Sequence, residues 1–253
     1  MDFYLGTDRL NWLSQINHPL MVSHRVLRNR KKMPTAIGSW VLDSGAFSEI
    51  SQYGEWTVPV IDYIKAVIRY RDEIGNMVWA APMDWMCEPW IIEKTGLTVK
   101  EHQQRTTKNY LDLVCRAPDL PWIPILQGWT LDDYHRHVEG YLNAGVSLQD
   151  QPVVGIGSVC RRQATAEAAG IIRSLWAQGI KNLHGFGFKV QGLREVGALM
   201  ASADSMAWSY RARRSKPLPD CTHKKCNHCQ KFALQWREKV VAGIPNEFQG
   251  PLL

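Results

Sequence analysis

The sequence contains no long hydrophobic run. No apolar stretch approaches the ~18 residues that a membrane-spanning helix requires, and the N-terminal stretch MDFYLGTDRLNW has aspartates where a secretory signal has basic residues and an apolar core. Low-complexity stretches and internal repeats are missing as well. The composition, with 45% hydrophobic and 21% charged residues, excludes disordered, collagen-like and coiled-coil chains. We therefore expect a soluble cytoplasmic protein without a membrane partner.

Cysteine is scarce outside one short segment. Three of the six cysteines, Cys87, Cys115 and Cys160, are scattered beside apolar segments, which is typical of inert buried thiols rather than of a disulfide framework. We also expect His135 and His137 on the solvated face of a helix, without a functional role.

The other three cysteines are bunched near the C-terminus. Cys221, Cys226 and Cys229 form with His223 the pattern Cys-x-His-x2-Cys-x2-Cys. Three thiolates and one imidazole at these short spacings are typical ligands of a closed, four-coordinate zinc site. We predict a structural Zn²⁺ here, with His228 as the rival fourth ligand. The alternative is a basic loop of unliganded thiols.

The net charge of +6 is unevenly distributed along the chain. Residues 208–240 contain nine of the 30 Lys and Arg residues but only two of the 24 acidic residues, so the rest of the chain is nearly neutral. A second basic cluster has no acid within it and comprises Arg25, Arg28, Arg30, Lys31 and Lys32. Two basic segments together with eleven Trp favour a nucleic acid as the partner. The alternative is a pair of solvated surface patches.

Short apolar runs alternate with amphipathic or Ala-rich segments. Eight runs predict strands: Phe3–Gly6, Leu20–Ser23, Trp40–Asp43, Val78–Asp84, Trp122–Gln127, Val153–Ser158, Leu183–Phe188 and Ser205–Ser209. Five segments predict helices: Val58–Glu73, Glu101–Cys115, Leu131–Ala144, Arg162–Gln178 and Leu193–Ser202. This alternation indicates parallel strands with crossover helices. Eight strands in 253 residues predict an α/β fold, a (β/α)8 TIM-like barrel, as a single domain over residues 1–253 that includes the basic segment.

Polar residues follow several of these strands. The strand ends carry Asp43-Ser44-Gly45, Asp84, Gln127-Gly128 and Gly157-Ser158. In a barrel these ends converge on the active-site face, although each acid alone is often a helix cap. A carboxylate at Asp84 can accept two N–H bonds from a guanine-like edge, and the Gln127 amide can both donate and accept. We expect the glycine-rich segment from Gly155 to Ser158 to present backbone N–H groups.

A further acid, Asp204, lies on or just before the last predicted strand. Asp43 and Asp204 are predicted on strands that can be neighbours in space. Displacement at a sugar C1′ needs such a pair, with one carboxylate as nucleophile and another group to move protons. A metal site and a plain ion pair remain alternatives.

These motifs together resemble the tRNA-guanine transglycosylase superfamily, in particular its phage and bacterial DpdA-type branch, which puts 7-deazaguanine bases into DNA. The motifs run in family order over nearly the whole chain: DSGAF at 43–47, PMD at 82–84, LQG at 126–128, VGIGSV at 154–159, HGFG at 184–187, ADSMAW at 203–208 and the cysteine cluster. The resemblance implies a (β/α)8 barrel with zinc near its C-terminus. It also implies residence in the host cytoplasm where the chain is phage-encoded, and leaves a homodimer open.

The resemblance implies a role for each matching residue. Asp204 would be the nucleophile that forms a covalent glycosyl intermediate, and Asp43 the general acid and base. Base-binding residues would be Asp84, Gln127, Gly157, Ser158 and Gly185, with Trp85 or Trp208 as stacking or simply buried rings. Because a target base in a duplex would have to be flipped out or single-stranded, the basic segment, with Arg211, Arg213, Arg214 and Lys216 in particular, is expected to contact the phosphates.

The chain departs from the family pattern in two places. Ala207 stands where bacterial members have a second aspartate, three residues past the first, so the nucleophile follows the archaeal-like spacing. The family zinc pattern is C-x-C-x2-C followed by a distant His. Here His223 replaces the middle cysteine, and Cys229 would supply the fourth ligand.

We expect a DNA-guanine transglycosylase that takes DNA and a free 7-deazaguanine base as substrates. Three alternatives remain: the same chemistry on tRNA, a non-catalytic zinc-stabilised nucleic-acid-binding barrel, and a glycosylase that only releases the base.

Overall fold

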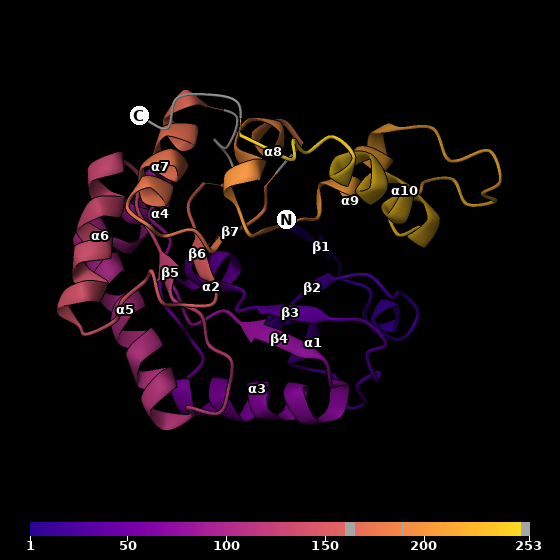
Figure 1. Cartoon of the computed structure of the whole chain (residues 1–253). Coiled ribbons are helices and arrows are strands. Elements are labelled where there is room, and N and C mark those ends of the chain that lie inside the picture. The colour runs from indigo at the N-terminus through magenta and orange to yellow at the C-terminus, as the bar shows by residue number, and fades with distance from the viewer. Residues whose placement is uncertain (160–164, 189, 249–253) are drawn as a thin grey trace.

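The computed structural model describes residues 1–159, 165–188 and 190–248, in which eight parallel strands form one curled sheet flanked by helices (Figure 1). The strands are β1 (Asp2–Gly6), β2 (Leu20–Ser23), β3 (Trp40–Asp43), β4 (Met77–Ala80), β5 (Ile125–Leu126), β6 (Val154–Ile156), β7 (Leu183–Gly185) and β8 (Ser202–Ser205). The α-helices are α1 (His24–Leu27), α2 (Ala46–Tyr53), α3 (Val60–Ile74), α4 (Pro89–Thr95), α5 (Val99–Arg116), α6 (Leu131–Asn143), α7 (Ala166–Ala177), α8 (Val190–Val196), α9 (Ala207–Arg214) and α10 (Gln230–Val241). Short 3₁₀ turns span Leu10–Ser14 and Gly197–Leu199.

The strand order is β4-β3-β2-β1-β8-β7-β6-β5, so the first and last strands of the chain pair side by side. Between β4 and β5 the ladder is replaced by one isolated parallel bridge, Ala80 to Trp122. Pro124 follows that bridge and has no N–H to continue a ladder. The α/β class and the eight parallel strands are therefore confirmed, whereas a continuous ladder around a closed barrel is not seen between β4 and β5 in the described residues.

Side chains alternate between the two faces of the sheet, as the pleat requires. Residues such as Leu5 and Leu42 face the helices and belong to the main core. Residues on the other face, among them Tyr4, Met21 and Trp79, form a separate small cluster. The rings of Tyr4 and Trp79 lie 5.9 Å apart although β1 and β4 are not adjacent, so this cluster fills the inside of the curled sheet.

The last strand was predicted wrongly as Ser205–Ser209. The strand is Ser202–Ser205, and the residues from Ala207 onward form α9. The helix buries Trp208, whose indole N–H donates to the Gly6 carbonyl at 2.8 Å. A short run of this kind cannot be assigned to helix or strand from periodicity alone.

Other expectations are tested by burial. Cys87 is buried as predicted, whereas Cys115 is exposed on α5, because its position on the helix faces solvent. Cys160 and the predicted helix start at Arg162 lie outside the described residues. Among the helices that the structure describes, none is long and apolar enough to cross a membrane.

Candidate active site

A cavity of about 230 Å³ opens at the carboxyl ends of the strands. Six of the residues predicted to form the site line it: Asp43, Asp84, Gln127, Gly157, Ser158 and Asp204. Apolar side chains complete the wall, including Met21, Phe47, Met86 and Phe186. The volume is below the range of about 300–1,000 Å³ that is usual for pockets of drug-sized ligands, so the cavity suits a small group.

A larger groove of about 920 Å³ lies between α5 and α6, outside the sheet. Two of its arginines form ion pairs along the helix surface: Arg116 contacts Asp112 at 2.5 Å, and Arg136 contacts Asp133. The smaller cavity is the better candidate because acidic side chains from three strand ends converge in it.

Asp43 ends β3 and lies at the turn into α2. The turn requires Gly45, whose φ of +81° is in the left-handed region, and an added Cβ would lie 2.9 Å from Cγ of Arg25. Burial raises the pKa of Asp43, and the charge of Asp204 raises it further. Hydrogen bonds from Ser23 and Gly45 offset part of this shift. Asp43 therefore holds a proton more readily than an exposed aspartate.

Asp204 lies on β8, where its backbone is paired with that of Tyr4. The backbone N–H of Gly187 donates to Oδ1 of Asp204 at 2.8 Å, and Nε2 of His184 lies 3.5 Å from the same oxygen. The expectation that Asp43 and Asp204 lie on neighbouring strands is wrong, because β2 and β1 separate β3 from β8. The two carboxylates meet instead as lining residues of the same cavity.

Asp84 follows β4 and is held by two side chains. The Ser44 hydroxyl donates to Oδ1 at 3.0 Å, and the Gln127 amide donates to Oδ2 at 2.6 Å. Burial, and then the charge of Asp43, raise the pKa of Asp84 to about 7. The Ser158 hydroxyl lies 2.7 Å from Oε1 of Gln127, so both ends of this amide are engaged. The network fixes the carboxylate and the amide in one orientation.

Gly155 in β6 and Gly157 directly after it do not have the role that the sequence suggested. The expectation that Gly155 and Gly157 present free backbone N–H groups is wrong, because both donate to carbonyls along β5 at 2.9 Å. Gly157 instead provides room: an added Cβ would lie 2.2 Å from Nε2 of Gln127. Ser158 follows with a φ of +55°, which is uncommon for a non-glycine residue and is often found at functional sites.

Gly185 is not among the residues that line the cavity. An added Cβ would meet Met200 at 2.3 Å and Phe188 at 2.5 Å, both in the helix-facing core. Its neighbours Phe186 and Gly187 do line the cavity. The predicted stretch is therefore present at the site, with the alternation of β7 turning Gly185 itself away.

The two tryptophans that were weighed as stacking rings are buried and do not line the cavity. Trp208 packs on Trp12 with ring centroids 5.2 Å apart, and Trp85 lies beneath the guanidinium of Arg105 at 4.5 Å. The aromatic faces of the cavity are those of Phe47 and Phe186.

His137 was predicted on a solvated helix face, and this is wrong. It is buried on α6, and the backbone N–H of Gln127 donates to its Nδ1 at 2.8 Å. Burial lowers the pKa of His137 to about 3, so the imidazole is neutral. Gln103 also supports Gln127 by donating to its carbonyl at 2.8 Å. The spacing of Tyr134, His137 and Tyr141 on one helix face was the signal that could have predicted this burial.

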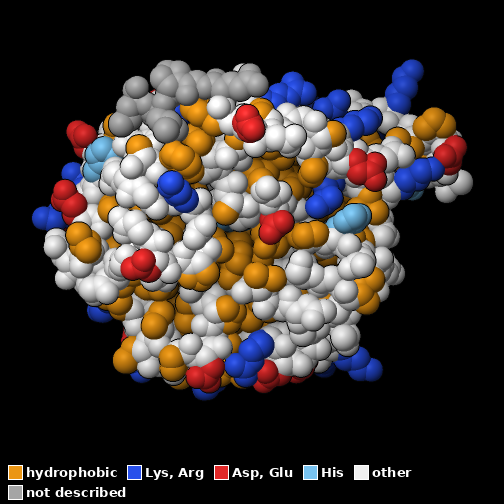
Figure 2. Space-filling model, viewed as in Figure 1, with side chains coloured by type: hydrophobic (Ala, Val, Ile, Leu, Met, Phe, Trp, Pro, Cys, Tyr) orange, Lys and Arg blue, Asp and Glu red, His pale blue; other side chains and the backbone are white. Residues whose placement is uncertain are grey.

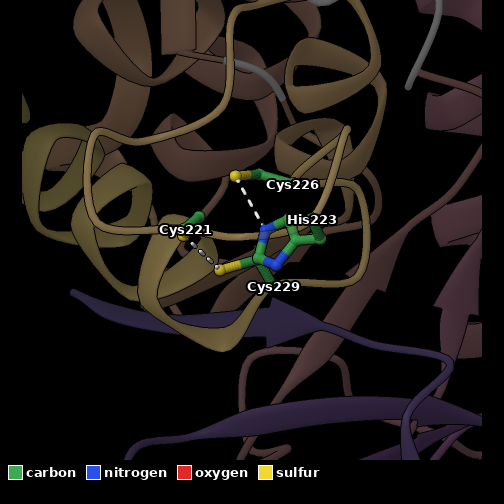
Figure 3. Close-up of side chains that lie close together, drawn as sticks. All are labelled: Cys221, His223, Cys226 and Cys229. Carbon is green, nitrogen blue, oxygen red and sulfur yellow. Dashed lines mark hydrogen bonds between the residues drawn. The ribbon is translucent and has the colours of Figure 1, made fainter.

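The predicted metal ligands come together near the C-terminus. Figure 3 shows the side chains of Cys221, His223, Cys226 and Cys229 turned toward one another. Each offers one ligand atom, and these atoms lie within 4.8 Å of one another. The sulfur atoms of Cys221 and Cys229 are 3.8 Å apart, the separation expected for two thiolates about 2.3 Å from one tetrahedral ion. His228 is not part of the cluster; its Nδ1 accepts a hydrogen bond from Arg9 at 3.1 Å. The four side chains can therefore hold a metal ion.

The cluster is anchored to the two C-terminal helices. The Ser209 hydroxyl on α9 donates to the carbonyl of Asn227 at 2.9 Å, and Lys225 donates to the carbonyl of Arg213 at 3.0 Å. The ring of Trp236 on α10 packs on Phe3 of β1 at 6.0 Å. These contacts fix the loop that carries the cluster against the sheet.

Basic side chains gather over α9 and α10 in the upper right of Figure 2. The residues predicted to contact phosphates, Arg211, Arg213, Arg214 and Lys216, are all exposed. The basic cluster formed by Arg25, Arg28, Arg30, Lys31 and Lys32 contains no acidic residue in the sequence, but one of its members has an acidic partner on another helix. Its Arg28 pairs at 2.9 Å with Glu49 of α2, which is buried.

A family model described as DpdA, DeoxyPurine in DNA protein A, matches residues 1–250. The chain therefore belongs to the DpdA family, and the resemblance drawn from its motifs is confirmed. No curated protein matches the chain. Membership supports, at the level of the family, a transglycosylase that modifies DNA.

Proposed function

We propose that this member of the DpdA family exchanges guanine in DNA for a 7-deazaguanine base through a covalent aspartyl-glycosyl intermediate. The observation that carries the proposal is the convergence of Asp43, Asp84, Gln127 and Asp204 in one cavity of about 230 Å³. The single bridge between Ala80 and Trp122 supports a sheet that closes into a (β/α)8 barrel. We take residues 1–253 as one domain.

In the first step Asp204 attacks C1′ of the target deoxyguanosine. A carboxylate oxygen forms a bond to C1′ while the C1′–N9 bond breaks, and the departing guanine takes up a proton. Asp43 lines the same cavity, and its raised pKa suits it to carry that proton to the leaving base.

In the second step the incoming deazaguanine restores the glycosidic bond. Asp43, now a carboxylate, takes the proton from N9–H of the new base. N9 then attacks C1′, the ester bond to Asp204 breaks, and both acids return to their starting states. The two half-reactions balance without a redox cofactor, since one base replaces another.

Asp84 and Gln127 would read the base. The carboxylate of Asp84 can accept from the N1–H and 2-amino donors of a guanine-like edge, and the amide of Gln127 can donate to a carbonyl oxygen. In the structure these groups bond to each other at 2.6 Å, so an entering base would exchange protein hydrogen bonds for its own. The rings of Phe47 and Phe186 offer stacking faces in the same cavity.

The Cys/His cluster would hold a structural Zn²⁺, because all four ligands come from the protein and leave no open position. Arg211, Arg213, Arg214 and Lys216 would contact DNA phosphates. Because C1′ is hidden within a duplex, the target nucleotide must be flipped out or single-stranded.

The proposal is tested by transfer of radiolabelled guanine and 7-deazaguanine bases into duplex DNA and into tRNA, side by side. We expect label in DNA with the wild type, and a loss of at least about 10⁴-fold in Asp204→Ala, because the nucleophile is removed. Asp62→Ala, an exposed residue on α3, is the matched control and should retain full exchange.

Other outcomes would redirect the proposal. Label in tRNA alone would move the substrate and keep the mechanism. Base release without any return of free base to the sugar would indicate a glycosylase. DNA binding without label, unchanged in Asp204→Ala, would indicate a non-catalytic binding barrel.

A further inference from the structure

His184 is a buried imidazole that the proposed reaction leaves without a role. It lies on β7, is fully inaccessible to solvent, and points into the curled sheet. Its ring contacts those of Tyr4, Trp79 and Phe186, with centroid distances of 6.0, 4.8 and 4.7 Å. These three rings restrict the orientation of the imidazole and exclude water from it.

The two nitrogen atoms of His184 have different surroundings. Nδ1 lies 2.9 Å from the hydroxyl of Ser202, its register partner on β8. Nε2 has no hydrogen-bond partner among the described residues, yet it is buried and lies 3.5 Å from Oδ1 of Asp204. A buried polar nitrogen without a hydrogen-bond partner is destabilising, so the position of Nε2 beside Asp204 needs a physical explanation.

The chemistry of the neighbours selects one tautomer. An ionised carboxylate can only accept hydrogen bonds, whereas a hydroxyl can donate or accept. The arrangement that satisfies both neighbours has the proton on Nε2, facing Asp204, while Nδ1 accepts from Ser202. The other tautomer would turn a nitrogen lone pair toward a negative oxygen.

We propose that His184 is a positioning residue for Asp204, and that its Nε2–H holds Oδ1 so that Oδ2 is the atom that attacks C1′. The inference rests on the proposed function. Gly187 already donates to Oδ1 at 2.8 Å, so both described donors approach the same oxygen. The distance from Nε2 is longer than a hydrogen bond, and such contacts commonly shorten in the complex with substrate.

The two half-reactions depend differently on this hydrogen bond. When Oδ2 bonds to C1′, Oδ1 becomes the carbonyl oxygen of an ester and accepts hydrogen bonds less strongly. When the ester breaks, the carboxylate regains its charge, and the donation from Nε2–H to Oδ1 strengthens again. His184 therefore favours release of the covalent intermediate more than its formation.

The test compares His184→Leu with His184→Gln, because the glutamine amide can place an N–H where Nε2–H stands. We expect His184→Leu to lower exchange by about 10- to 100-fold and to raise the fraction of protein trapped covalently on DNA in a denaturing gel. His184→Gln should recover most of the rate and return the trapped fraction toward that of the wild type. His24→Leu removes another buried imidazole, paired with Tyr70, and should leave the trapped fraction unchanged.

Equal behaviour of His184→Leu and His184→Gln in both measurements would overturn the inference. Failure of the proposed function is recognised separately, because the wild type itself would then transfer no label. In that case ¹⁵N NMR of the imidazole decides whether Nε2–H bonds to Asp204. A proton on Nδ1, or an Nε2 resonance that Asp204→Asn does not move, would reject the hydrogen bond.

Discussion

The strand-end cavity and the Cys/His cluster both gather side chains that can lose a proton, but they do so over very different lengths of chain. The cluster takes its four ligands from residues 221–229, and their ligand atoms lie within 4.8 Å of one another. The cavity takes Asp43, Asp84 and Asp204 from three strand ends spread over most of the sequence. The nine-residue loop is anchored by hydrogen bonds to α9, and a bound ion would join its four ligands, whereas the cavity is held by the sheet itself.

The two regions also neutralise charge differently. In the cluster, burial and then the neighbouring sulfur atoms of Cys229 and Cys226 raise the pKa of Cys221 to about 11, and a bound cation would favour its thiolate form. In the cavity, burial and then the charge of Asp43 raise the pKa of Asp84 to about 7, so a bound proton can neutralise this carboxylate. Removing a metal ligand should therefore unfold a segment, while removing a cavity acid should change chemistry and pH dependence.

The largest expected effect is that of breaking the cluster with Cys226→Ser. Structural zinc sites in small domains bind with about 10–16 kcal/mol, and that binding free energy is folding free energy. We expect bound metal to fall from one ion per chain to less than a tenth, with loss of hydrogen-exchange protection in residues 218–229. Mass spectrometry under native conditions and hydrogen exchange measure both quantities.

Cys115→Ser, on the exposed side of α5, is the matched control and should keep the metal. Full metal content in Cys226→Ser would show that the cluster does not bind as a four-ligand site. That result would also contradict the expected difference between the cluster, which a metal ion would stabilise, and the cavity, which the sheet stabilises.

The second prediction concerns the pH dependence of stability that Asp84 confers. Its pKa is about 7 in the folded chain and near 3.8 when unfolded, so between these values the folded state binds more protons. Stability must then fall as pH rises through this window. We expect the free energy of unfolding of wild type to drop relative to that of Asp84→Asn by up to about 4 kcal/mol between pH 4 and pH 8. Urea unfolding at several pH values measures the difference.

Asp150→Asn, at an exposed loop position, provides the matched comparison and should show a flat difference. A flat difference for Asp84→Asn as well would mean that the carboxylate is ionised throughout, and that the cavity does not rely on a proton.

The extent to which the sequence predicted each region follows from how each is built. The ligand set of the cluster depends on local spacing alone, and all four predicted ligands converge. The cavity depends on strand ends, and the polar residues after β3, β4, β5 and β6 could be located because each follows an apolar run that ends within a few residues. Both signals are short-range, and both survive errors of a residue or two in element boundaries.

What the sequence could not predict depends on orientation and pairing. His184 lies in an apolar run, and only the alternation along β7 turns it inward while turning Gly185 outward. The backbone N–H groups of Gly155 and Gly157 donate to the carbonyls of Pro124 and Leu126. The strand register that pairs them cannot be predicted from hydrophobic periodicity. Arg28 forms its ion pair with Glu49, which lies on α2. Each of these features depends on a contact with a residue that is distant in the sequence.

The third prediction concerns the room that Gly157 leaves for the side chain of Gln127 in the cavity. In Gly157→Ala the new Cβ would lie 2.2 Å from Nε2 of Gln127, so the amide must move and its bond to Asp84 must break. We expect a loss of about 1–3 kcal/mol in stability, together with loss of base exchange. Gly170→Ala on α7 meets nothing within 4 Å and should stabilise the chain by about 0.5–1 kcal/mol. Thermal unfolding of both variants gives the comparison, and equal shifts would contradict it.

The smallest expected effect is that of a single basic residue near the cluster. Arg213→Ala removes one exposed cation from α9. If Arg213 contacts a phosphate, the slope of log affinity against log salt should decrease in magnitude by about 1, equally for all DNA sequences. Fluorescence anisotropy with two unrelated duplexes at several salt concentrations measures this slope.

The matched variant for this last measurement is Lys65→Ala, on the exposed face of α3. Figure 1 places α3 on the opposite side of the sheet from α9 and α10, so the slope should stay that of the wild type. A change that depends on DNA sequence would assign Arg213 to base contact, and an unchanged slope would show that Arg213 makes no phosphate contact. In Cys226→Ser the slope of log affinity against log salt should decrease in magnitude by more than 1. Lys225, which lies within the cluster loop, donates a hydrogen bond to the carbonyl of Arg213, so loss of the cluster should displace several basic residues of this segment. The metal site would then affect DNA binding through the position of its basic neighbours, whereas the role proposed for the cavity is contact with the base.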